Sequence, residues 1–75
     1  MYEPSERIEK QIAEAFVYHA PKDDQRERYA VIRNRARELA QVIAQSTPES
    51  REQSLALTKL EEAVMFANAA IARHE

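Results

Sequence analysis

The chain has 75 residues and a formal net charge of −2, and it contains neither glycine nor cysteine. Without glycine it cannot carry a Walker loop or a nucleophile elbow, and without cysteine or closely paired histidines it has no metal-ligand motif, so we expect neither catalysis nor a cofactor. The slightly acidic balance argues against duplex nucleic acid as a partner. The lack of a signal-peptide pattern and of an apolar run near ~20 residues argues against a membrane location and favours the cytoplasm.

The composition favours long, uninterrupted helices, because about a third of the residues are charged and only three are proline. We therefore predict one all-α domain over residues 1–75, built as a short helix followed by a long antiparallel helical hairpin. The helices are expected at about 4–17, 24–46 and 48–74. A chain of this size buries only about 60% of its unfolded surface, so we expect it to be oligomeric.

The first predicted helix is short and amphipathic. Pro4 falls in its first turn, and Ile8, Ile12, Ala15 and Phe16 recur at the spacing of one helical face. Isolated helices of about 12–15 residues are marginal in water. This helix must therefore pack on the hairpin or on a neighbouring subunit.

The boundaries of the next two helices are predicted from capping signals. Pro21 breaks the chain, and Asp24 with Glu27 three residues later forms a variant of the capping box, so a helix is expected to begin near residue 24. Thr47 as N-cap and Pro48 as the first helical residue would open the last helix.

Both long helices carry a row of apolar residues at spacings of three and four, and we call these two rows the seam. The seam consists of Tyr29, Ile32, Ala36, Leu39 and Ile43 in the first row and Leu57, Leu60, Val64, Ala67 and Ile71 in the second. Two matched rows joined by a short connection predict an antiparallel hairpin. Val31, Val42, Leu55 and Phe66 lie off the seam and suggest a second buried surface, a contact between subunits.

The first long helix is the most basic part of the chain. Its arginines are Arg26, Arg28, Arg33, Arg35 and Arg37. Arg26, Arg33 and Arg37 project along one edge of the apolar row. One interpretation is a solvated face whose arginine stems cover the seam and form local ion pairs. The other is an anion pocket, because the guanidinium fork suits phosphate.

Aromatic side chains before this helix fit the anion interpretation. Phe16, Tyr18 and His19 would offer flat surfaces on which nucleotide bases stack. By itself, a lone histidine in a turn such as His19 is more often a capping or surface residue than a ligand. Asn68, at the edge of the seam, is either a polar group that sets the helix register or a group that faces a ligand.

Three parts of the sequence resemble the helical-hairpin domain of bacteriophage anti-CBASS proteins. They are the run from Phe16 through Tyr18 and His19, the pair Ile32-Arg33 and the segment KLEEAVMFANAAIAR. Those proteins are small sponges for cyclic oligonucleotide messengers, and phage inhibitors of Thoeris defence contain a related hairpin. The resemblance covers about residues 16–73. It implies that Tyr18 stacks on a base and that Arg33 holds the phosphates of a cyclic dinucleotide.

The resemblance also implies an assembly and a biological role. Family members are hexamers of interlocked hairpins, and their sponge action in the host cytoplasm silences immune signalling without catalysis. Some bind cyclic trinucleotides through a basic residue in the last helix, where this chain has Asn68 and, a turn further on, Arg73. The alternative from the residues alone is a structural or regulatory protein-interaction module with solubilising arginines.

Overall fold

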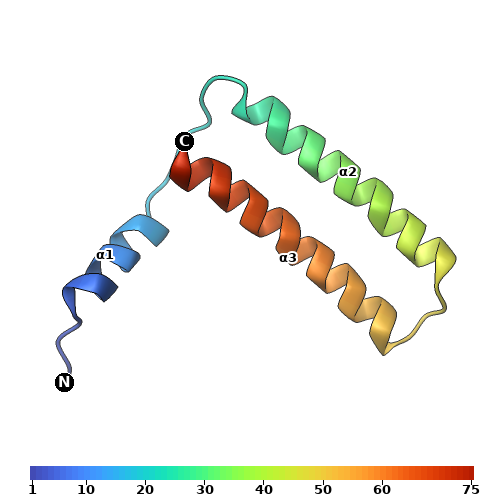
Figure 1. The fold of residues 1–75 in the computed structure, drawn as a ribbon, viewed down its shortest axis with the longest axis horizontal. Helices are drawn as coiled ribbons and strands as arrows, with labels where there is room; N and C mark the ends of the chain where they lie inside the picture. The colour runs from blue at the N-terminus through green and yellow to red at the C-terminus, as the bar shows by residue number, and fades with distance from the viewer.

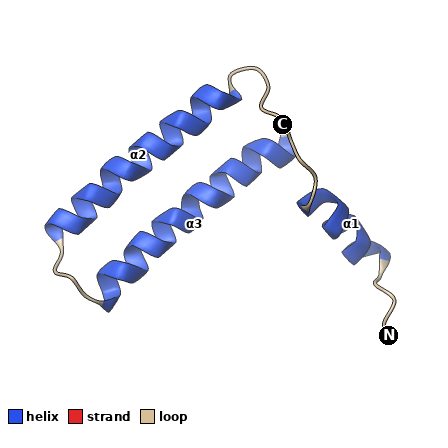
Figure 2. Ribbon diagram, turned by 180° about the vertical axis from the view of Figure 1, so that it is seen from behind, coloured by secondary structure: helices blue, strands red, loops and turns tan.

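The computed structural model describes all residues, 1–75, and consists of three helices and no strand (Figure 1). Helix α1 spans Glu6–Ala15, α2 spans Gln25–Ser46 and α3 spans Arg51–His74. Helices α2 and α3 lie side by side and antiparallel, while α1 projects away beyond the end of α3 (Figures 1 and 2). The prediction of an all-α chain is confirmed. None of the three helices is long and apolar enough to cross a membrane.

Helix α1 is shorter than expected because a serine caps it. The hydroxyl of Ser5 accepts a hydrogen bond from the backbone N–H of Ile8 at 3.3 Å, which fixes the helix start after Pro4. The helix ends at Ala15, and the N–H of the next residue, Phe16, caps it by donating to the carbonyl of Ile12 at 3.1 Å. No residue of α1 is buried, and Ile12 on its apolar face is exposed, so the rest of the chain leaves this face largely uncovered.

The predicted start of the last helix at Thr47 and Pro48 is wrong. The N-cap is Ser50, whose backbone is extended and whose hydroxyl accepts from the N–H of Gln53 at 3.1 Å. Thr47 closes α2 instead, because its hydroxyl donates to the carbonyl of Ile43 at 2.7 Å. A threonine that satisfies the preceding helix is not available to cap the next one.

The capping box predicted for Asp24 and Glu27 does not form either. Asp24 occupies the N-cap position, but its carboxylate caps no backbone N–H and accepts from Nε of Arg28 at 3.1 Å. The turn is held by Gln25, whose Oε1 accepts from the N–H of Lys22 at 3.1 Å while its own N–H donates to the Lys22 carbonyl at 3.0 Å. The glutamine side chain therefore takes over the stabilisation expected of the aspartate.

The two rows of the seam face each other and are half-buried, with one exception. Leu39 is 48% exposed, and Ala40 takes its place toward α3. A straight α-helix drifts by about 20° per heptad from a 3.5-residue repeat, so a pattern of threes and fours loses its register along α2. The predicted seam is thus correct except at Leu39.

The isolated chain has no hydrophobic core. Its only buried residue is polar, Gln25. The molecule measures 48 × 38 × 13 Å, and its short dimension is close to the ~10–12 Å thickness of one helix with its side chains. Large apolar side chains are consequently exposed, among them Ile12, Phe16, Val31, Val42, Leu55, Met65 and Phe66.

Leu60→Ala should lower the free energy of unfolding by about 1–3 kcal/mol, because it removes a half-buried side chain from the seam. Thr58→Ala, on the exposed side of the same helix, should change it by no more than about 0.5 kcal/mol. Chemical denaturation followed by circular dichroism measures both. Equal losses would mean that the seam is assigned wrongly.

Candidate functional site

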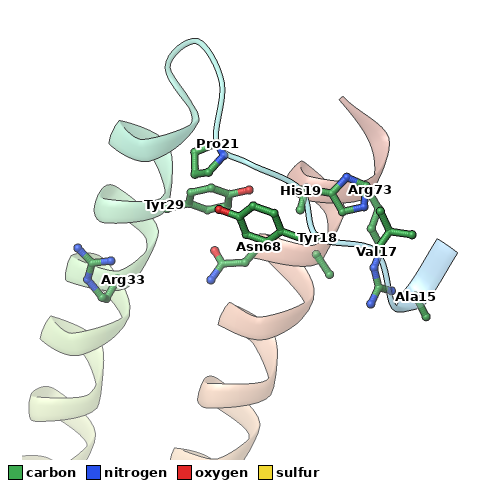
Figure 3. A pocket seen from close by; sticks show the side chains of 11 residues that line it. Ala15, Val17, Tyr18, His19, Pro21, Tyr29, Arg33, Asn68 and Arg73 are labelled. Atoms are coloured by element: carbon green, nitrogen blue, oxygen red, sulfur yellow. The ribbon is translucent and has the colours of Figure 1, made fainter. Parts of the chain in front are cut away.

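A pocket of about 590 Å³ lies where the loop between α1 and α2 passes the open end of the hairpin (Figure 3). Three parts of the chain contribute polar and aromatic side chains to it. They are Tyr18 and His19 from the loop, Tyr29 and Arg33 from α2, and Asn68 and Arg73 from α3. The small residues Ala69 and Ala72 line its α3 wall and leave room for a ligand.

Helical spacing explains how α2 presents two of these side chains together. Tyr29 and Arg33 are four residues apart, so they lie on one face of the helix. Tyr29 was not predicted as a site residue, because its spacing assigns it to the seam. Its position one turn before Arg33 is the signal that could have identified it.

Tyr18 is the more accessible of the two tyrosines in the pocket. It is 85% exposed, and Figure 3 shows its ring beside that of Tyr29. An exposed ring at the wall of a pocket presents a flat apolar face that the folded chain does not cover. Such a face suits stacking against a planar ligand.

Asn68 presents an unsatisfied polar atom. Its Oδ1 is buried and accepts no hydrogen bond within the chain. In Figure 3 the amide projects from α3 into the space beside Tyr18 and toward α2. An unpaired buried acceptor typically costs about 1–3 kcal/mol. The helix register is therefore not set by a hydrogen bond to this oxygen.

Five of the eight predicted site residues line this pocket, namely Tyr18, His19, Arg33, Asn68 and Arg73. The other three do not. Phe16 is 84% exposed at the end of α1. Arg37 lies one turn beyond Arg33 and lines a groove of about 470 Å³ between α2 and α3, and Arg26 is exposed and lines neither. Arg33 lines this groove as well, so Arg33 and Arg37 share one side of α2, and only Arg26 lies apart from them.

A second hollow of about 510 Å³ adjoins the pocket. It lies between α1 and the end of α3, and its lining includes His19, Arg73 and His74. His19 and Arg73 therefore line both the pocket and the second hollow, and the loop lies between these two spaces. One arginine is accessible to ligands from two sides.

A cluster of polar contacts, which we call the clasp, ties residue 75 to the start of α2. Nη1 of Arg28 donates to Oε2 of Glu75 at 2.7 Å, and Nε2 of Gln25 donates to Oε1 at 3.2 Å. Nζ of Lys22 donates to the Glu75 carbonyl at 2.9 Å. Because Gln25 also bonds the backbone of Lys22, the clasp holds the end of the loop where it joins α2.

The clasp shifts the pKa of both charged partners. Hydrogen bonds from Arg28 and then from Gln25 lower the pKa of Glu75 to about 2, and the hydrogen bond to Glu75 raises the pKa of Arg28 above its ordinary value. Both side chains are 39% exposed, so solvent screens the pair. The carboxylate is charged at neutral pH, and the clasp is then complete.

The side-chain carboxyl of Glu75 should titrate with a pKa of about 2 in the folded protein, against an ordinary value of 4.5. Because the folded pKa is the lower one, the stabilisation is present above about pH 4.5 and is lost as the pH falls toward about 2. Carbon-13 NMR titration of the carboxyl measures this directly.

Two variants test the cause of the shift. Arg28→Ala should return the pKa of Glu75 toward its ordinary value, whereas Arg35→Ala, which breaks only the exposed pair with Glu38, should not. A midpoint near 4.5 in the unaltered protein would contradict the clasp.

Comparison with known proteins places the chain in a family. The family model described as Acb2/Tad1, hairpin domain, matches residues 9–72. No curated protein and no solved structure matches the chain. The matched range runs from within α1 to near the end of α3 and includes the loop with Tyr18. The chain therefore belongs to the Acb2/Tad1 hairpin family, the anti-CBASS and anti-Thoeris sponge family that its residues resemble.

Proposed function

We propose that this protein is a phage anti-defence sponge that binds cyclic dinucleotides in the pocket formed by the loop, α2 and α3. One observation carries the proposal: the pocket combines an exposed aromatic ring, Tyr18, with the guanidinium groups of Arg33 and Arg73 and contains no carboxylate. Membership of the Acb2/Tad1 family supports the same role.

The distribution of ion pairs favours the anion-pocket interpretation of the arginines. Arg28 pairs with Asp24 at 3.1 Å and with Glu75, and Arg35 pairs with Glu38 at 3.2 Å. Arg33 has no carboxylate within ion-pair distance, although the chain has 13 acidic residues. An arginine left without a counter-charge in a pocket is available for phosphate.

The two arginines of the pocket suit a ligand with two phosphates. Arg33 projects from α2 and Arg73 from α3, so the positive groups stand on opposite walls. A cyclic dinucleotide carries one negative charge on each of its two phosphates, with its bases outside the ring they form. Tyr18 would stack on one base while the arginines hold the phosphates.

The proposed activity needs no chemical step. A sponge removes its messenger by mass action, to the extent that sites outnumber messenger molecules and their concentration exceeds the dissociation constant. The protein would act in the cytoplasm of the infected cell. The second hollow, which shares Arg73, is the place where a cyclic trinucleotide would be sought.

We further propose that the protein is a hexamer, because no apolar side chain of the isolated chain is buried and both faces of the hairpin expose large ones. Sedimentation at micromolar concentration should give a species of about six times the chain mass of 8.7 kDa. Phe66→Glu should dissociate it, since a charge at an exposed apolar position cannot be buried without a partner. Gln41→Glu, at an exposed position of α2 with no large apolar side chain one turn before or after it, is the control. A stable folded monomer of the unaltered protein would refute the assembly.

Binding of cyclic dinucleotides can be measured by titration calorimetry. Tyr18→Ala should weaken it by about 1–3 kcal/mol through the loss of stacking. Arg33→Ala should weaken it by about 1.5–3 kcal/mol through the loss of a charge-assisted hydrogen bond.

Arg35→Ala is the matched control for these variants, because Arg35 is exposed and already paired with Glu38. Its affinity should stay within a factor of about three. Sedimentation of each variant shows whether the assembly is intact. If the unaltered protein binds no cyclic dinucleotide, or if all three variants behave alike, a protein-interaction module is the better description.

A further inference from the structure

The groove of about 470 Å³ between α2 and α3 is apolar along its floor and charged at its edges. Exposed Arg33 and Arg37 stand on the α2 side, and exposed Glu61 stands on the α3 side. The floor consists of half-buried apolar residues, namely Ala36, Ala40, Leu57, Leu60 and Val64. Such a floor suits the apolar side chains of another helix.

Helix α1 carries the second uncovered apolar surface of the chain. Its apolar stripe consists of Ile8, Ile12 and Ala15, and none of these residues is buried. Figure 1 shows that the helix projects away from the hairpin of its own chain. A helix of this length is marginal in water by itself, so its stripe needs a surface that covers it.

The stripe and the groove have the same length. The stripe covers residues 8–15, and the groove is lined by residues of 33–40 in α2 and of 57–64 in α3. At 1.5 Å per residue each of these three segments extends over about 10.5 Å. The stripe of α1 would therefore lie along most of the floor.

The charges beside the stripe complement the edges of the groove. At about 100° per residue, Glu9 borders the stripe on one side and Gln11 borders it on the other. Glu9 and Arg37 are exposed, and neither forms an ion pair within the chain. A helix in the groove with Glu9 toward α2 brings a carboxylate to Arg37 and an amide donor to Glu61.

We propose that α1 of one copy lies in the groove of a second copy and that its Glu9 pairs with Arg37 of that copy. The inference rests on the proposed assembly, since it names a contact that holds the copies together. The exchange covers two apolar surfaces that the isolated chain leaves open. Because Tyr18 follows α1 closely, it also anchors the end of the loop that the clasp leaves free.

The test uses two variants of the whole chain with opposite charge reversals, Glu9→Arg and Arg37→Glu. Each variant alone brings like charges together, so the concentration of half-assembly, measured by sedimentation, should rise at least about tenfold. In an equimolar mixture each α1 finds a groove of opposite charge on a copy of the other variant. The concentration of half-assembly should then return to within about threefold of that of the unaltered protein, as it should when one chain carries both reversals.

Arg26→Glu is the matched control for Arg37→Glu, because Arg26 is exposed on α2 outside the groove. It should assemble like the unaltered protein and should not rescue Glu9→Arg in a mixture. The inference is overturned if both reversal variants assemble normally alone, or if their mixture assembles no better than either variant.

The outcomes also separate this contact from the assembly as a whole. If the unaltered protein sediments as a hexamer but the mixture is not rescued, the assembly stands and this contact is rejected. If only the chain with both reversals assembles, α1 lies in the groove of its own chain, which also overturns the inference. A monomeric unaltered protein rejects the assembly and the inference together.

Discussion

Two helices lying side by side have no interior, and this constraint governs the whole molecule. The hairpin is a single layer 13 Å thick, so each seam residue can be covered on one side only and remains half-buried. Helix α1 adds little cover, because it projects away from the hairpin and none of its own residues is buried (Figure 1). We therefore infer an assembly, in which contacts between chains would supply the free energy that a small globular protein gains from its core.

The absence of a core gives polar contacts an unusual role in shaping the site. Gln25 is the one buried residue, and it holds the loop to the start of α2 while also bonding Glu75. The clasp thus joins the start of α2 to the end of α3 at the open end of the hairpin, where the helices have no covalent connection. Tyr18 and Asn68 belong to segments that meet only there, so the geometry of the pocket depends on these hydrogen bonds.

Under the proposed function the arginines of α2 serve two purposes, and the two interpretations of them apply to different residues. Arg28 and Arg35 are neutralised by carboxylates, as expected of a solvated helix face. Arg33 lies in a pocket whose lining has no acidic residue. Two residues that are two positions apart on an α-helix, such as Arg33 and Arg35, project from different sides of it. One basic helix can therefore stabilise the fold on one side and attract phosphate on the other.

The sequence by itself determined the features that depend on near neighbours: the helices, nine of the ten seam positions, and the placement of Tyr18 and Arg33 close to one pocket. These follow from periodicity and from the break at Pro21.

Only the tertiary structure decided how residues far apart in the chain meet. The ion pair of Arg28 with Glu75 spans 47 positions, and the orphan oxygen of Asn68 depends on what the loop and α2 place beside it. The caps of α2 and α3 were mispredicted because Thr47 and Asp24 each had a competing partner that a local pattern does not reveal. Such contacts depend on the register between helices, which residue spacing along one helix leaves undetermined.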